Sequence, residues 1–421
     1  MGNGLCVETS SSWTVFDWLD KVLGSVGSYA GLVKLRHDDD FIDRLSHHYT
    51  TMLLVIFTIV VSTKQYVGDA IQCWCPAQFT EAQVHYANQI CWVSNTYHIP
   101  METVIPESVD SRKEKQLTYY QWVPFILLMM ALLFKLPRVA WKVLTFSHSI
   151  SIDQFVSMVW SLQLAAKTER DVKLAEMTDY LESWLSTAEH NRSSCCLPAK
   201  QKVAKYSCLV CGRRYGNVFI TACLVVKGLY AFNAFLHFFA LNAFLGRDFA
   251  GWGFEIISGL ADENPEYLKA SPRFPRVTLC DFEIRQMSNL HRWTVQCVLP
   301  INLFNSKIFL FIWFWLLFLA VVSFLSLGTT IYASMFPHNR VEFIRKYMIM
   351  RKVILQRGGE NRTVNKFVMS YLKFDGVFVL RVAAHNATEV LTGQLIENLY
   401  NKYKTTMHTE VKQNSVPGEY V

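Results

Sequence analysis

Four long apolar segments dominate the pattern of hydrophobic and polar positions. They run from about Tyr49 to Val61, Trp122 to Phe134, Val218 to Leu245 and Ile308 to Leu327. Spanning a hydrocarbon core of ~30 Å takes about 20 mostly apolar helical residues. Buried helices of soluble proteins carry a charged face, which the second and fourth segments lack. We therefore predict an all-α membrane protein with transmembrane helices at 41–64, 119–134, 217–245 and 303–334.

Lys and Arg in the connecting segments predict the orientation. The stretch from Lys135 to Gly216 holds twelve and the tail after Met335 holds thirteen, against three between Gln65 and Thr118. The connection 246–302 holds six, balanced by seven acids. Cytoplasmic loops carry the excess of positive residues. We expect a cytoplasmic N-terminal segment 1–40, loop 135–216 and C-terminal region 335–421, with extracellular loops at 65–118 and 246–302.

Composition supports a membrane protein. Hydrophobic residues make up 51% of the chain and charged residues 18%. The formal net charge of +7 would favour nucleic-acid binding only if the basic residues gathered on one soluble domain, and here they alternate with apolar runs. We expect membrane lipids, and no nucleic acid, as partners. The enzyme motifs GxGxxG, P-loop and HExxH do not occur, so we expect neither an enzyme nor a cofactor.

The middle loop and the tail carry helical periodicity. Apolar residues recur at helical spacing in both segments, at Val156, Met158, Val159, Leu162, Leu164 and Leu174, and again at Val341, Ile344, Met348 and Ile354. Such spacing indicates amphipathic helices. We predict that the two segments together build one mostly helical cytoplasmic domain.

The cysteines divide between the two predicted sides. The outer loops hold Cys73, Cys75, Cys91, Cys280 and Cys297, where disulfides are expected. The cytoplasmic loop holds the group Cys195, Cys196, Cys208 and Cys211. Adjacent cysteines do not easily face one tetrahedral ion, so we favour free juxtamembrane thiols there over a zinc site and expect no metal.

Two polar features interrupt the apolar segments. Thr51, Thr58 and Ser62 fall near one face of the first helix, where they line a pore or pack against another helix. Lys227 stands within the third segment. For Lys227 we favour a side chain that reaches the inner boundary of the membrane over a charge in the pore.

The residues before the second helix form a recognisable motif. Tyr119, Tyr120, Gln121, Trp122, Val123 and Pro124 follow one another there, which indicates interfacial aromatics and then a proline kink. The string YYQWV at this place resembles the signature of the innexins, the invertebrate gap-junction proteins. The resemblance extends to Gln72-Cys73-Trp74, to Cys91-Trp92 and to the cysteine pair of the second outer loop, and covers the chain to about Met350.

The innexin resemblance implies a function. It implies a plasma-membrane hemichannel built as a ring of roughly eight subunits, homomeric or heteromeric. The segment from Met1 to about Leu23 would line a cytoplasmic funnel, and the outer loops would dock with the hemichannel of an adjoining cell. Candidate pore-lining residues are this segment, the polar stripe of the first helix and Asp69.

Four outer cysteines allow three pairings. Bonds between the loops constrain the unfolded chain more than bonds within a loop, and a rigid docking face lowers the ordering cost of association. Antiparallel placement of the loops would pair Cys73 with Cys297 and Cys91 with Cys280. The innexin resemblance implies the same pattern. We predict these two bonds, with Cys75 free.

Two other functions are consistent with four spans. A pannexin-like channel would release small molecules without docking, and a transporter would show repeated halves and broken helices, which the chain lacks. The sequons at Asn191, Asn361 and Asn386 all lie on the predicted cytoplasmic side. Bare outer loops favour docking over the pannexin alternative.

Overall fold

The computed structural model describes residues 40–100, 102–146, 152–163, 165–187, 216–246, 249–261, 273–354, 361–386 and 388–414. The predicted funnel segment 1–23 and the cysteine group 195–211 lie outside these ranges. The described residues form two compact units. The first contains Leu45–Lys135 and Phe232–Val321, and the second contains 40–44, Leu136–Ala231 and Val322–Val421 within their described parts.

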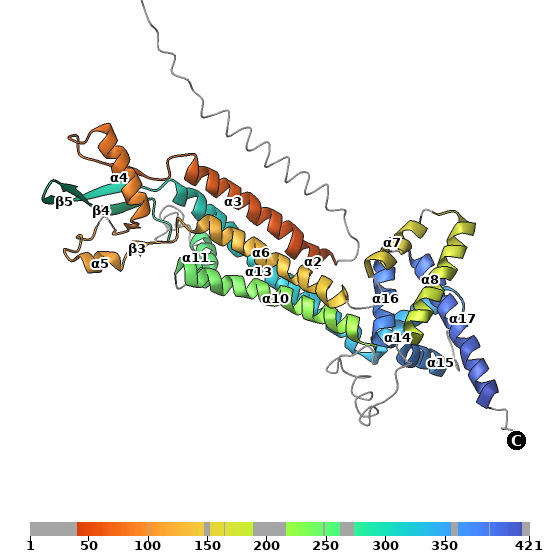
Figure 1. Ribbon diagram of the computed structural model, residues 1–421. Helices are drawn as coiled ribbons and strands as arrows, with labels where there is room; N and C mark the ends of the chain where they lie inside the picture. The colour runs from red at the N-terminus through yellow and green to blue at the C-terminus, as the bar shows by residue number, and fades with distance from the viewer. Residues whose placement is uncertain are drawn as a thin grey trace, which may run out of the picture. The chain divides into compact units, whose positions relative to one another are not determined.

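Four helices are long and apolar enough to cross a membrane, so the predicted four-span class is confirmed. The first comprises α2 (Phe41–Arg44), the π-helical turn η1 (Leu45–Tyr49) and α3 (Thr50–Tyr66), and the others are α6 (Val123–Phe146), α10 (Val218–Leu245) and α13 (Ile301–Met335). Within the first unit they pack side by side (Figure 1).

The second span differs most from its predicted range of 119–134. Helix α6 begins at Val123, because Tyr119 to Trp122 form a turn in which the Trp122 amide donates to the Tyr119 carbonyl. It continues past Lys135 and through Pro137. Pro124 occupies the first turn, where proline fits a helix without bending it. The expected proline kink at this position is therefore wrong.

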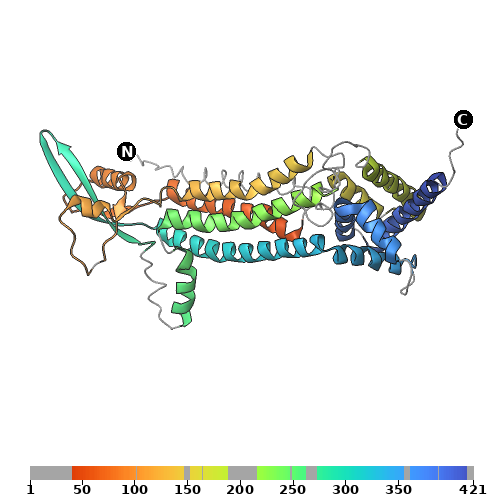
Figure 2. The ribbon, with the colours of Figure 1, turned by 90° about the horizontal axis from the view of Figure 1, so that it is seen from below.

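A five-stranded antiparallel sheet joins the two loops of the first unit, beyond what the all-α expectation included. Its order is β1-β5-β4-β2-β3. The strands are β1 (Gln72–Trp74), β2 (Thr96–Tyr97), β3 (Gln116–Leu117), β4 (Val277–Gln286) and β5 (Asn289–Val298). The β4–β5 hairpin, teal in Figure 2, carries short strands of the other loop on both sides.

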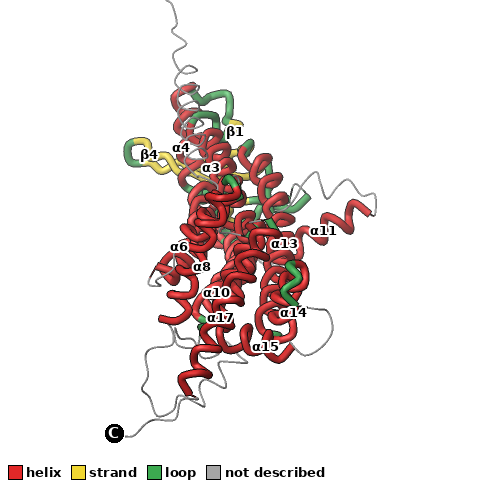
Figure 3. Tube along the Cα trace, turned by 90° about the vertical axis from the view of Figure 1, so that its right-hand side faces the viewer, coloured by secondary structure: helices red, strands yellow, loops and turns green. Residues whose placement is uncertain are grey.

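The two loops also contain three helices: α4 (Glu81–Val93) and α5 (Val109–Lys113) in the first, and α11 (Phe249–Ala261) in the second. A capping box between Thr80 and Gln83 starts α4. Helix α11 projects sideways from the spans (Figure 3), and it is attached where the Trp313 indole donates to the Ala250 carbonyl at 3.2 Å. Gly253 allows this approach, because a Cβ there would overlap the Trp313 ring.

One apolar core runs through the first unit from the spans into the sheet domain. It includes Leu127 and Leu316 of the spans together with Cys91, Cys280 and Cys297 of the loops. Because these residues share one cluster, the spans and the sheet domain of this unit support one another.

The second unit contains a helical domain. Its helices are α7 (Ile152–Leu162), α8 (Lys167–Thr187), α14 (Pro337–Met350), α15 (Asn361–Lys366), the π-helical η3 (Phe367–Leu372), α16 (Lys373–Asn386) and α17 (Glu389–Asn414). Val156 and Val159 of the middle loop share an apolar core with Ile344 and Met348 of the tail. The two segments thus form one helical domain, as the periodicity predicts. Met158 is 41% exposed, and Leu164 lies outside the described residues.

Candidate functional site

Two disulfides join the loops of the sheet domain. Cys73 is bonded to Cys297, and Cys91 is bonded to Cys280. Cys73 and Cys297 are directly opposite each other in the antiparallel pair of β1 and β5, while Cys91 ties α4 to β4. These are the two pairs expected from the sequence. Each bond links chain segments that are far apart in sequence, so the two loops act as one structural element.

Cys75 is a free thiol in the structure, and its side chain packs partly buried against the apolar core. Burial raises the pKa of this thiol above its ordinary value. A raised pKa favours the protonated, less reactive form. Cys75 therefore resembles a small core residue more than a reactive group.

The aromatic motif before α6 joins three elements. Tyr120 is fully buried, its ring centroid lies 4.9 Å from that of Trp92, and its hydroxyl donates to the Trp92 carbonyl at 3.4 Å. The Gln121 amide also donates to this carbonyl, and the Gln65 amide of α3 donates to the Gln121 carbonyl at 3.3 Å. Only the Trp122 side chain is largely exposed, at 58%. The motif thus packs the ends of two spans against α4, whereas an interfacial belt would leave both tyrosines exposed.

Asp281 is a polar centre of the sheet domain that the sequence analysis did not identify. Its carboxylate accepts hydrogen bonds from the Tyr97 hydroxyl at 2.9 Å, from Arg112 at 2.8 Å and from the Thr294 hydroxyl at 2.7 Å. Burial, together with the bond to Asp281, raises the pKa of Tyr97 to about 12. Arg112 belongs to α5 and Tyr97 to β2, so one carboxylate of β4 holds two parts of the first loop.

The predicted polar stripe of the first span lies on α3. The Thr51 hydroxyl donates to the His47 carbonyl at 2.9 Å and lies 3.4 Å from the Ala131 carbonyl of α6, and the Thr58 hydroxyl donates to the Leu54 carbonyl at 2.8 Å. Thr51, Thr58 and Ser62 are all partly exposed. Asp69 is exposed beyond the end of α3 and accepts a hydrogen bond from Gln72 at 3.1 Å.

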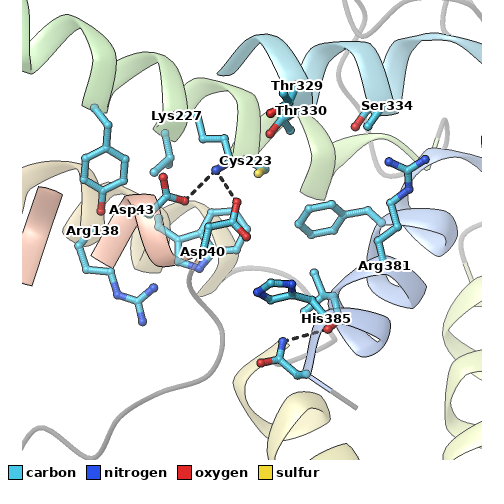
Figure 4. Close-up of a pocket in the computed structure, with 17 residues that line it drawn as sticks. Asp40, Asp43, Arg138, Cys223, Lys227, Thr329, Thr330, Ser334, Arg381 and His385 are labelled. Atoms are coloured by element: carbon cyan, nitrogen blue, oxygen red, sulfur yellow. Dashed lines mark hydrogen bonds and ion pairs between the residues drawn. The ribbon is translucent and has the colours of Figure 1, made fainter. Parts of the chain in front are cut away.

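Lys227 is paired inside the second unit. Its Nζ atom lies 2.6 Å from Asp40, 3.0 Å from Asp43 and 2.9 Å from the Ser326 hydroxyl, as Figure 4 shows for the two carboxylates. The lysine side chain is only 3% exposed. Lys227 thus forms a buried ion pair that holds the start of the first span, and its reach to the inner boundary of the membrane stays a prediction.

Asp375 caps the start of α10. Its carboxylate accepts hydrogen bonds from the backbone amides of Val218 at 2.8 Å and Ile220 at 3.2 Å. Free amides at a helix N-terminus favour such an anionic partner. Burial outweighs these bonds and raises the pKa of Asp375 to about 6. A lone Asp in the tail gives no local signal of this role.

These features define a class of protein: a membrane protein with four spans, whose two disulfide-linked loops fold into one sheet domain. Comparison with known proteins agrees. A family model described as Innexin matches residues 39–403. Innexin unc-9 of Caenorhabditis elegans is 38% identical over 371 residues, covering 88% of this chain and 94% of that protein.

Other relatives carry the same family name. Innexin-3 of Caenorhabditis elegans is 35% identical over 365 residues, covering 87% of this chain and 84% of that protein. Innexin-19 of Caenorhabditis briggsae is 32% identical over 409 residues, covering 92% and 91%. The chain belongs to the innexin family, whose members form gap-junction channels in the membrane. The undocked pannexin-like alternative is not favoured.

Proposed function

We propose that this innexin is one subunit of a ring of about eight, made of this chain alone or with related chains. The ring is a plasma-membrane hemichannel that docks with the hemichannel of an adjoining cell. Ions and small metabolites then pass between the two cytoplasms. No covalent chemistry is needed, because pore width and rings of repeated side chains select what passes.

In the proposed topology, the sheet domain is extracellular and both termini are cytoplasmic. Both disulfides of the described residues belong to the sheet domain, and disulfides persist in oxidising compartments. The excess of Lys and Arg in the other connections supports the same orientation. Two independent properties of the chain thus favour one arrangement.

The observation that carries the docking proposal is an apolar tip on a cross-linked domain. Met287, at the turn of the β4–β5 hairpin, is fully exposed, and Leu290 beside the turn is 57% exposed. Apolar side chains at the tip of a rigid domain suit a contact between proteins, because little ordering cost opposes association. The same surface on a second hemichannel is the partner that the family function requires.

The proposed conduction path uses the residues predicted from the sequence. Thr51, Thr58, Ser62 and Asp69 contribute one polar group per subunit to the wall of the pore. Each such residue is repeated around the ring, so a single substitution changes a whole belt of the pore.

Paired-cell recording tests this function. Cells that express the chain should show current between the partners of a pair, and Met287→Asp should abolish it because the substitution places a charge in every docking contact. Single-cell hemichannel current is the internal control and should persist in the variant. Hemichannel current in the wild type without any junctional current would favour the pannexin-like alternative.

A projection image of the purified particle tests the assembly separately. A ring with a central hole is expected. A compact particle without rotational symmetry would contradict the channel and favour a transporter.

A further inference from the structure

A cavity of about 320 Å³ lies inside the second unit, where several helix ends meet. Figure 4 shows it between the start of the first span, the ends of α6 and α13, the first half of α10 and helix α16. Three cationic side chains and two carboxylates are among the residues that line it. The function proposed above assigns no role to this cavity.

Arg381 of α16 is a cation of the cavity whose hydrogen-bond donors are only partly satisfied by the described residues. One terminal nitrogen donates to the Asn339 carbonyl at 3.2 Å, and the guanidinium carbon lies 5.0 Å from the Phe343 ring centroid. Its Nε atom is buried without a hydrogen-bond partner among the described residues. Burial lowers the pKa of this guanidinium, and no carboxylate of the described residues forms an ion pair with it. A buried cation of this kind is stabilised by a bound anion.

The two carboxylates that line the cavity are paired with Lys227 and not with Arg381. Asp40 and Asp43 both contact the Nζ atom of Lys227. Figure 4 shows this group on one side of the cavity and Arg381 with His385 on the other. Arg138 is drawn on the same side as the two carboxylates, so the Arg381 guanidinium is the cation of the cavity that lies apart from them. It presents hydrogen-bond donors without a competing carboxylate.

The remaining walls fit an amphiphilic molecule. Trp141, Phe378 and Val226 supply apolar surface, and Ser334 supplies a hydroxyl close to the basic side. Phosphate oxygens suit a guanidinium because its donors form a planar fork that binds them in pairs. Basic pockets at the ends of spanning helices lie at the depth of lipid headgroups.

We propose that this cavity binds a phosphate-bearing anion, with its phosphate on Arg381 and its less polar part against Trp141 and Phe378. The source of the phosphate is either the headgroup of an anionic phospholipid or a soluble phosphate ester. Occupancy would join α16 of the helical domain to the ends of α6 and α13 in the same unit. Binding at this site depends on neither docking nor the assigned orientation.

The test uses the full chain in phosphatidylcholine nanodiscs. Binding of an acyl-labelled phosphatidylinositol bisphosphate is measured by fluorescence transfer for the wild type, Arg381→Gln and Arg362→Gln. Arg362 is exposed on α15 and does not line the cavity, so its variant removes the same charge elsewhere. We expect Arg381→Gln to weaken binding about tenfold and Arg362→Gln to leave it unchanged.

Competition distinguishes the two sources. Displacement of the labelled lipid by inositol trisphosphate or inorganic phosphate identifies a soluble ligand, and displacement only by unlabelled anionic lipid identifies the headgroup. Both outcomes support the phosphate site. Equal binding by wild type and Arg381→Gln, or no binding by wild type, would overturn it.

A measurement on the unmodified chain covers the case in which the variant fails to assemble. A photoreactive form of the same lipid should label peptides that contain residues 373–386 or 329–334. Labelling confined to other peptides would equally reject the site.

Discussion

The Nζ atom of Lys227 lies 3.0 Å from the Oδ2 atom of Asp43, and the two side chains are 3% and 17% exposed. This contact joins α10 to the first turn of the first span. Asp40, whose carboxylate lies 2.6 Å from the same Nζ atom, is the first residue described in the structure. The base of the N-terminal segment is therefore held by an ion pair.

Lys227→Met should destabilise the protein markedly. Removing the buried lysine leaves two carboxylates without their counter-ion, of which Asp43 is 17% and Asp40 52% exposed. Because water reaches both in part, the loss should lie below the value of about 3 to 5 kcal/mol for a fully buried pair. The thermal midpoint of the detergent-solubilised protein should fall, and Asp43→Asn in the same chain should restore part of the loss. Lys142→Gln, at an exposed position of α6, is the control and should change little. Equal midpoints for Lys227→Met and Lys142→Gln would show that the pair contributes nothing.

Together, the two disulfides should stabilise the protein by less than the sum expected if each closed its own large loop. The bonds span 224 and 189 residues in sequence. While Cys91–Cys280 is intact, however, Cys73–Cys297 closes a loop on the order of only 35 residues. In the chain-entropy model this bond then contributes about 4 kcal/mol, and removal of both bonds loses roughly twice that amount.

Paired serine variants measure this difference. Denaturant unfolding of Cys73→Ser with Cys297→Ser should show the smaller loss, and replacement of all four cysteines the larger. Cys75→Ser should unfold like the wild type, because Cys75 forms no bond. Non-reducing peptide maps give the connectivity directly, and recovery of Cys75 linked to Cys297 would contradict it.

The spans were predictable and the sheet was not, for one physical reason. A spanning helix satisfies its backbone locally, so a continuous apolar run is sufficient to reveal it. Strands β1, β2 and β3 are two or three residues long and pair with partners far along the chain. In β4 the structure buries Thr278, Cys280 and Phe282 in alternation, but Val277 and Leu279 on the opposite face are apolar too, so the sequence shows no clean alternating pattern.

The site residues likewise divide into those that the sequence reveals and those that depend on distant partners. The cysteine pairs followed from the number of loop cysteines, chain entropy and the innexin resemblance. Lys227 was conspicuous because an ionisable residue in an apolar run is unusual, but its partners lie 187 and 184 positions away. Asp281 and Asp375 act only through tertiary contacts, which a single sequence does not record.

Asp281→Asn should loosen the first loop of the sheet domain. The uncharged amide accepts a weaker hydrogen bond from Arg112. Its NH2 group also places a donor where three donors now converge. We expect the free energy of unfolding to fall by about 1.5 to 3 kcal/mol. Hydrogen exchange of residues 109–117 should increase. Glu283→Gln on the same strand is the matched control, because its pair with Arg292 is exposed and worth about 0 to 1 kcal/mol. Equal exchange in both variants would assign Asp281 no special role.

The polar stripe of the first span stays a prediction that thiol chemistry tests. Cysteine at Thr51, Thr58 or Ser62 should react with water-soluble reagents and alter the current, whereas cysteine at Leu53 or Ile56 should not. Thr51 is the strictest test of the three positions, because its hydroxyl contacts the Ala131 carbonyl of α6. A side chain that faces this helix would be protected from the reagent. Reaction at Ile56 alone, which is 47% exposed, would move the conduction path to a different face.

Asp375 predicts a pH dependence of stability. Its pKa of about 6 in the folded protein exceeds the value of about 3.9 for an unfolded chain, so the folded state binds more protons between these values. The contribution of Asp375 is therefore largest below the unfolded pKa and decreases as the pH rises through about 6. Acidification from about pH 7 to about pH 5 should stabilise the wild type relative to Asp375→Asn.

Comparing the wild type with Asp375→Asn isolates the titration of Asp375 from that of the other ionisable groups. Asparagine keeps a carbonyl that can accept the Val218 amide proton but does not ionise, so the other titrating groups contribute equally to both proteins. The quantity to measure is the difference in thermal midpoint between wild type and variant at each pH. A difference that stays constant between the two pH values, or that shifts in favour of the variant on acidification, would show that burial does not hold the pKa of this cap above its ordinary value.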